Sequence, residues 1–167
     1  MCADMKIKVL IICFCVIIIG VLIGLLLMSK SGEDIKKIKR LYFTYSKGYM
    51  VNSGVKYELE NDKNGCKVTI KPYDVPDKDE ISLYVSDNYS KKVEEVLNKY
   101  SVVKWDGFKG NDPYVLDGDS FSMTLTLDDG REINASGYMD WPDNYMKVRN
   151  ELDDIFMEIY NETDRSN

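Results

Sequence analysis

The chain has 167 residues, with 22 Lys and Arg, 28 Asp and Glu, no His, and a formal net charge of −6 at pH 7. The absence of histidine excludes Ser-His-Asp and Cys-His nucleophile systems and every zinc site that uses histidine. The acidic balance also argues against a nucleic-acid partner, because binding to phosphates needs clustered Lys and Arg.

The first long segment, residues 9–28, is an apolar run without a charged residue. As a helix its length is about 30 Å at about 1.5 Å per residue, which matches the hydrocarbon core of a bilayer. The sequence that follows, Ser29-Lys30-Ser31, is a poor signal-peptidase site. We therefore expect a short tail over residues 1–8 and an uncleaved transmembrane helix over residues 9–28 that contacts membrane lipid.

The orientation of this span follows from two opposing indications. Lys6 and Lys8 precede it, and a larger group of basic residues follows it: Lys30, Lys36, Lys37, Lys39 and Arg40. The positive-inside rule thus favours a cytoplasmic C-terminal part. The common plan of a bacterial signal anchor, a short basic tail before a single span and a folded domain, favours the opposite. We expect a single-pass protein of the cell membrane with an extracellular C-terminal domain.

Residues 29–40 are expected to form a juxtamembrane linker, followed by a globular domain over residues 41–160. The aromatic and β-branched run near residues 40–46 predicts a strand. Apolar and charged residues alternate over 55–60 and again over 66–71, on either side of an Asn-Gly turn. This pattern predicts a β-hairpin.

A shorter alternation over residues 81–85 predicts another strand. Asp87 or Asn88 can then cap a helix, because the apolar residues that follow recur at helical spacing and form one stripe: Tyr89, Val93, Val96, Leu97 and Tyr100. The rest of that helix is charged, as a solvated face would be.

Residues 121–127 and 133–137 alternate around Asp128-Asp129-Gly130 and predict a second hairpin. Pro142 suits the first turn of a last helix, whose apolar stripe consists of Tyr145, Val148, Leu152, Ile155, Phe156 and Ile159. Residues 161–167 are expected to be a flexible tail. The predicted fold is α+β: an N-terminal transmembrane helix, then an antiparallel sheet of two hairpins with two helices packed on one face.

Neither the cysteines nor the acidic residues form a recognisable metal or cofactor site. Of the four cysteines, only Cys66 lies outside the N-terminal segment, which excludes an intradomain disulfide and a cysteine-based metal site. The acidic loop of residues 111–119 lacks the spacing of an EF-hand. We therefore expect no cofactor and no metal.

One stretch combines aromatic and acidic residues and is the candidate ligand surface: Trp105, Asp106, Tyr138, Asp140, Trp141 and Tyr145. Aromatic faces stack on sugars, and two carboxylates could act as acid and base on a glycan. The simpler interpretation is structural, because Asp-Gly pairs are typical of turns and aromatic residues beside a helix start usually fill the core.

The segments 103–108, 115–121, 135–138 and 141–145 resemble those of small uncharacterised lipoprotein-like or membrane-anchored proteins of Gram-positive, clostridial-type bacteria. The resemblance covers roughly residues 41–160 and implies a bacterial cell-envelope setting. It supplies no activity and no site residues. The chain lacks the lipidated cysteine of the lipoprotein members, so its anchoring depends on residues 9–28.

These observations favour a membrane-anchored domain that is not an enzyme but a binding or interaction module, with an envelope protein or a glycan as its partner. One alternative is an envelope glycan hydrolase that uses carboxylates such as Asp106, Asp117, Asp119 and Asp140. Another is an accessory subunit of a membrane complex, because Gly20 and Gly24 form a Gly-x-x-x-Gly pattern that can pack two helices.

Overall fold

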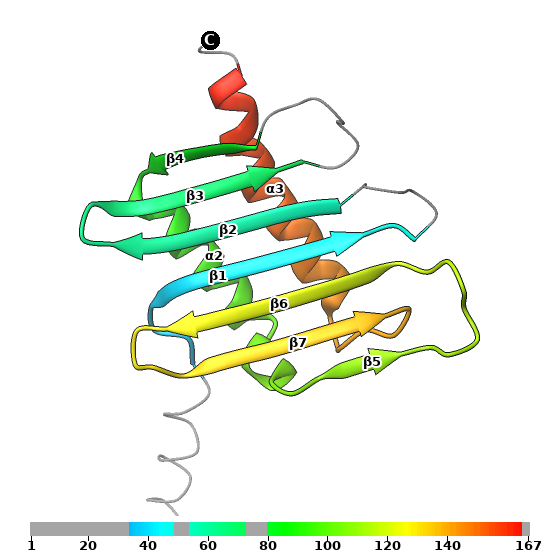
Figure 1. Ribbon diagram of the computed structural model, residues 1–167. Coiled ribbons are helices and arrows are strands. Elements are labelled where there is room, and N and C mark those ends of the chain that lie inside the picture. Colours follow the sequence, from blue (N-terminus) through cyan, green and yellow to red (C-terminus); the bar gives the residue numbers. More distant parts are fainter. Residues whose placement is uncertain (1–33, 49–53, 73–79, 165–167) are drawn as a thin grey trace, which may run out of the picture. The chain divides into compact units, whose positions relative to one another are not determined.

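The computed structural model describes residues 34–48, 54–72 and 80–164 (Figure 1). The chain separates into two compact units after Asp34, and the unit from Ile35 onward contains all the described helices and strands. The expected span over residues 9–28 and the tail over 1–8 lie outside the described residues. Within the described ranges, no helix combines the length and the hydropathy needed to cross a membrane.

A seven-stranded sheet forms the centre of this unit, with the strand order β4-β3-β2-β1-β6-β7-β5. The strands are β1 (Ile38–Ser46), β2 (Gly54–Asp62), β3 (Gly65–Lys71), β4 (Ile81–Val85), β5 (Lys109–Asn111), β6 (Ser120–Leu127) and β7 (Glu132–Tyr138). Neighbouring strands are antiparallel except β5 and β7, which are parallel.

Two helices, α2 (Asp87–Lys99) and α3 (Tyr145–Asp164), lie behind the sheet and cover one face (Figure 1). A short 3₁₀ helix, η1 (Val102–Trp105), follows α2. The α+β class is therefore confirmed, but the sheet is larger than the predicted antiparallel sheet of two hairpins. β1 pairs with both β2 and β6 and so joins the hairpins into one sheet, while β4 and β5 extend its two edges.

The folded unit begins earlier than the expected boundary at residue 41. Ile35 and Ile38 are buried, and their backbone N–H groups donate to side chains of α2. The acceptors are the Asn98 amide oxygen at 2.8 Å and a Glu94 carboxylate oxygen at 2.9 Å. Residues 35–40 thus belong to the fold rather than to the expected linker over 29–40.

Strand alternation places the apolar residues toward the helices. In β1 and its two neighbours, Phe43 pairs with Tyr57 on one side and Met123 on the other, and all three side chains are buried. Both predicted hairpins are confirmed, and their apolar residues face the helices as expected. Side chains alternate between the two faces of a strand, so only one pairing register buries all the apolar residues. The opposite face of the sheet is polar and faces solvent.

The helix ends differ slightly from the prediction. Ser86 caps α2, since its hydroxyl accepts from the N–H of Asn88, where Asp87 or Asn88 was expected. α3 begins at Tyr145, after Asn144 in a left-handed conformation with φ of 63°, so Pro142 precedes the helix rather than lying in its first turn. α3 also continues to Asp164, into the segment expected to be a flexible tail.

Candidate functional site

The six residues of the predicted ligand surface do not form one surface. Trp105 and Tyr145 are each only 2% exposed and belong to the core. The Trp105 indole N–H donates to the backbone oxygen of Asp143 at 3.1 Å, which ties η1 to the segment before α3. These two aromatics stabilise the fold and present almost no area to a ligand.

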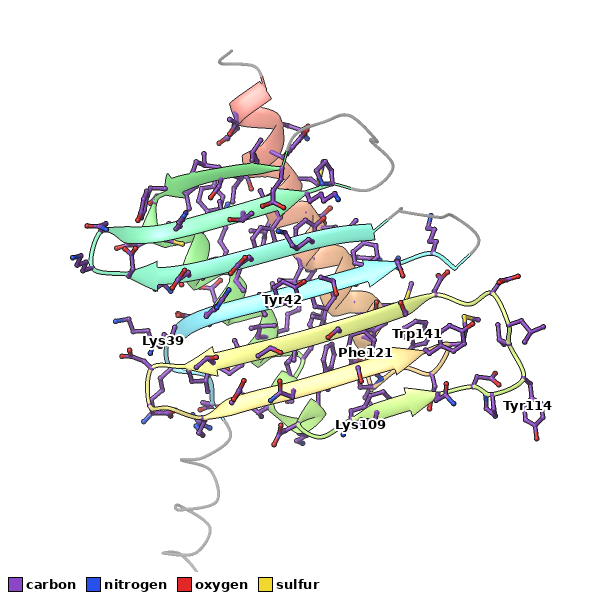
Figure 2. The ribbon with its side chains drawn as sticks, in the orientation of Figure 1. Lys39, Tyr42, Lys109, Tyr114, Phe121 and Trp141 are labelled. Atoms are coloured by element: carbon purple, nitrogen blue, oxygen red, sulfur yellow. The ribbon has the colours of Figure 1, made fainter. Side chains whose placement is uncertain are left out.

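An aromatic cluster surrounds Phe121, the second residue of β6. Its ring centroid lies 4.5 Å from that of Tyr145, 5.8 Å from that of Trp141 and 6.2 Å from that of Trp105. Trp141 stacks on Tyr145 with centroids 4.7 Å apart and an interplanar angle of 8°. Trp141 is half-buried, so it closes the cluster toward solvent (Figure 2).

Asp106 and Asp140 lie at the two ends of β7. The Asp106 carboxylate accepts from the N–H of Asn134 at 3.1 Å, near the start of the strand, whereas Asp140 follows its end. β7 itself ends at Tyr138, and the chain turns at Met139, which has a φ of 52°, so that the backbone oxygen of Asp140 lies beside Gly137. The glycan-hydrolase hypothesis, which needs an acid and a base about 5 to 9.5 Å apart, stays a prediction for these two carboxylates.

Tyr138 takes part in a local network rather than in a ligand surface. Its hydroxyl accepts from the N–H of Gly118 at 2.8 Å and faces the backbone oxygens of Leu116 at 2.8 Å and Val115 at 3.1 Å. One side chain of β7 therefore fastens the loop of residues 112–119 between β5 and β6, which we call the β5–β6 loop. This loop has a defined backbone.

The β5–β6 loop presents two large apolar side chains to solvent. Tyr114 is 93% exposed and Leu116 is 91% exposed, and Figure 2 shows Tyr114 projecting away from the sheet. The loop is also acidic. The Asp112 carboxylate accepts from the N–H of Tyr114 at 3.0 Å, and Asp117 and Asp119 flank Gly118.

Close packing holds the base of the β5–β6 loop. A β-carbon on Gly118 would collide with the side chain of Met139, and one on Gly48 would collide with the backbone of Gly118. The Asp119 carboxylate also accepts from the N–H of Gly48 at 3.4 Å. The glycines at 48 and 118 let the end of β1, the loop and the residue after β7 meet.

On the helix side of the sheet, a hollow of about 450 Å³ opens next to the aromatic cluster. We call it the Lys104 hollow; its lining includes Tyr100, Lys104, Trp105, Phe108, Trp141 and Pro142. Lys99 also lines it and pairs with Glu151 at 2.6 Å, while Lys104 forms no ion pair with any described residue. The hollow thus combines aromatic walls with two basic residues, Lys99 and Lys104, and one acidic residue, Asp143.

A second hollow, of about 230 Å³, lies on the other side of Trp141 and includes Arg149 and Asp119. The Arg149 guanidinium lies 5.2 Å from the centre of the Tyr45 ring, and its Nε atom is buried without a hydrogen-bond partner among the described residues. The Tyr45 hydroxyl donates to Asp153 at 2.9 Å. This arrangement fixes α3 to the end of β1.

Tyr45, Tyr57, Arg149 and Asp153 interact with one another, and we call them the Asp153 network; burial determines how these groups bind protons. Desolvation raises the pKa of the Asp153 carboxyl, although hydrogen bonds from Tyr45 and Tyr57 and the charge of Arg149 oppose the rise. Burial likewise raises the pKa of Tyr45 and of Tyr57 well above the ordinary tyrosine value. Burial also raises the pKa of the Cys66 thiol to about 11, so this cysteine is a core residue and not a reactive thiol.

The open face of the sheet carries a third hollow of about 370 Å³, over β1, β2 and β6. Hydroxyl groups dominate its floor, and Ser46 and Ser120 hydrogen-bond to each other across the strands at 2.8 Å. Lys56 pairs with Glu80 at 2.5 Å at its edge. Within the described part of the chain, no group of three or more acidic or cysteine residues could hold a metal ion.

The spacing of residues on α3 contained a signal for the Asp153 network, which the apolar stripe of that helix alone did not reveal. Tyr145, Arg149 and Asp153 are spaced by four, so they share one edge of the buried stripe of α3. Polar residues at such a border often pair with the sheet. Nothing local marks Tyr114 and Leu116 as exposed, because their exposure depends on how Tyr138 holds the loop.

No protein-family model matches the chain, and no curated protein matches it either. The similarity to clostridial-type envelope proteins and the alternatives of a glycan hydrolase and an accessory subunit therefore stay predictions.

Proposed function

We propose that the protein is a membrane-anchored, non-catalytic interaction module of the cell envelope, and that the β5–β6 loop is its contact element. The observation that carries this proposal is the nearly complete exposure of Tyr114 and Leu116 on a loop that Tyr138 holds in place. Isolated apolar residues on a surface are ordinary. Two on one fastened loop, with Met139 37% exposed beside Gly118, form a patch.

The fixed backbone of the loop favours binding. A loop that is already ordered loses little conformational freedom when a partner covers it, so more of the gain from apolar burial appears as affinity. Tyrosine is also frequent at the centres of protein interfaces, because it buries a large area with few rotatable bonds. The acidic residues around the patch favour a partner whose contact surface is basic at its rim.

The position of the loop is consistent with this role. Ser46 at the end of β1 pairs with Ser120, which directly follows the loop, whereas Ile38 at the start of β1 pairs with Leu127. The nine residues of β1 separate these ends by about 27 Å. The loop therefore lies at the end of the sheet opposite to the one where the chain enters (Figure 1), which leaves it accessible to a partner.

Site-specific photo-crosslinking tests the contact element. We would place p-benzoylphenylalanine at Tyr114 in the full chain, and in a control at Tyr84, which is 50% exposed on β4 at the other edge of the sheet. Irradiation of native cells should give discrete adducts from position 114 and few from position 84. Equal yields from both positions, or none from position 114, would contradict the proposal.

The membrane part of the proposal rests on residues 9–28 and needs its own test. In a variant with Cys2, Cys13 and Cys15 changed to Ser, Asp117→Cys supplies an exposed thiol while Cys66 stays buried. Labelling of intact cells by a membrane-impermeant maleimide would support an extracellular domain. Labelling only after lysis would place the domain inside the cell.

A further inference from the structure

We propose that the partner of the β5–β6 loop is a second copy of this chain, whose Lys104 hollow receives Tyr114 and Leu116. This inference rests on the proposed function, in which the loop is the contact element. It identifies the occupant of the loop and adds a second site, the hollow, that the proposed function does not need. Three features of the described residues carry it: chemistry, size and position.

The chemistry of the two sites is complementary. The loop presents an apolar pair flanked by the carboxylates of Asp112 and Asp117. The hollow presents aromatic walls and, at its rim, the ammonium of Lys104. The other charges near the hollow balance in number: Lys99 pairs with Glu151, Asp143 lines the hollow, and Lys147 lies 6.0 Å from the centre of the Tyr100 ring. Lys104 is thus the cation left for the loop.

The size of the hollow suits its proposed occupant. Its volume of about 450 Å³ lies within the range of roughly 300 to 1,000 Å³ of pockets that enclose small ligands. An aromatic side chain and an aliphatic one from a single loop are small enough to enter such a space. Phe108 and Trp141, the half-buried aromatic residues of its wall, offer the stacking and edge contacts that a tyrosine ring prefers.

The two sites lie at the same end of the sheet. The β5–β6 loop runs directly into β6 at Ser120, and the next residue, Phe121, has its ring 6.2 Å from Trp105 and 6.5 Å from Phe108. Two copies that stand side by side with their sheets parallel can therefore bring the loop of one copy to the same height as the hollow of the other. Tethering in the same membrane would raise the effective concentration of each site for the other.

The two sites also lie on different faces of the unit. Tyr138, which fastens the loop, pairs with Ser120 on the open face, whereas the hollow lies among η1 and the segment before α3. Contact between them is therefore head to tail, and each copy can give its loop to one neighbour and its hollow to another. Such an interface builds a closed ring or an open row.

The first test uses disulfide formation between two differently tagged full-length chains in one membrane, both with Cys2, Cys13 and Cys15 changed to Ser. One chain carries Leu116→Cys and the other Asp143→Cys, which lines the hollow and leaves Lys104 in place; the control pair combines Tyr84→Cys with Asp143→Cys. All three positions are exposed, so the variants should fold. Mild oxidation should yield at least ten times more mixed dimer from the first pair. Equal yields would overturn the inference.

The second test separates the failure of this inference from the failure of the proposed function. With p-benzoylphenylalanine at Tyr114, the main adduct should have twice the mass of the chain and should map to the residues of the hollow. Asp117→Lys and Lys104→Glu should each lower its yield several-fold, and their combination should restore it. Adducts only with other proteins would overturn self-docking and leave the contact element intact, while the absence of any adduct would overturn both.

Discussion

Two aromatic regions lie close together in the sequence at one end of the sheet, and they differ in their exposure to solvent. The cluster of Trp105, Phe121, Trp141 and Tyr145 is turned inward, where each ring touches another. The β5–β6 loop turns Tyr114 outward into solvent. The cluster therefore stabilises the fold, whereas the loop contributes little to it and is the element that we propose a partner covers.

The largest predicted effect comes from opening the cluster. Trp105→Ala removes a buried indole and its hydrogen bond to Asp143, and large-to-small changes of this kind cost about 3 to 5 kcal/mol of unfolding free energy. Urea unfolding of the full chain in detergent, followed by circular dichroism, measures it. Trp141→Ala serves as the control and should cost less, because Trp141 is half-buried.

The next effect concerns the link between the two regions. Tyr138→Phe removes the hydroxyl that fastens Gly118 and Leu116 and should cost about 1 to 2 kcal/mol, since two or more hydrogen bonds are lost. Hydrogen exchange of the Gly118 amide should also accelerate, while exchange in β2 and β3 should not change. An unaltered rate at Gly118 would show that the loop does not depend on Tyr138.

The Asp153 network predicts a pH dependence of the folding stability. Because the pKa of Asp153 is raised above its ordinary value of 3.8 on folding, the folded state holds the proton more tightly. The carboxyl therefore contributes stability below pH 3.8 that is lost as the pH rises through its folded pKa. Unfolding free energies measured between pH 3 and pH 7 should show this loss relative to Asp153→Asn, and parallel curves would contradict the assignment.

The smallest effect on stability is expected in the loop itself. Tyr114→Ala removes a side chain that is 93% exposed, so the unfolding free energy should change by no more than about 0.5 kcal/mol. The same change should abolish docking, which makes it the sharpest contrast with Trp105→Ala. A loss of several kcal/mol would mean that Tyr114 packs within its own chain.

Much of the fold could be predicted because its signals are local. The alternation around Asn64-Gly65 and Asp129-Gly130 determines both hairpins, and helical spacing determines the buried stripes of α2 and α3. The central place of β1 and the parallel edge strand β5 could not be predicted in this way. Both depend on pairing between distant segments, and β5 has only three residues.

The candidate site was harder to predict, because burial and not residue type decides which aromatic side chains meet a ligand. Trp105 and Tyr145 drew attention by type but are buried, whereas Tyr114 and Leu116, in the acidic loop of residues 111–119, are exposed. The exposure of this pair follows from a hydrogen bond between β7 and a loop about twenty residues earlier. Such a contact leaves no periodic pattern in the sequence.

The most direct test of the central claim, that a partner covers the β5–β6 loop, is hydroxyl-radical footprinting of Tyr114 and Leu116. Their oxidation would be compared between native membranes and monomeric chains in detergent, with Tyr84 as the internal reference. We predict strong protection of Tyr114 and Leu116 in membranes and no change at Tyr84. Equal oxidation of the loop in both samples would contradict the account.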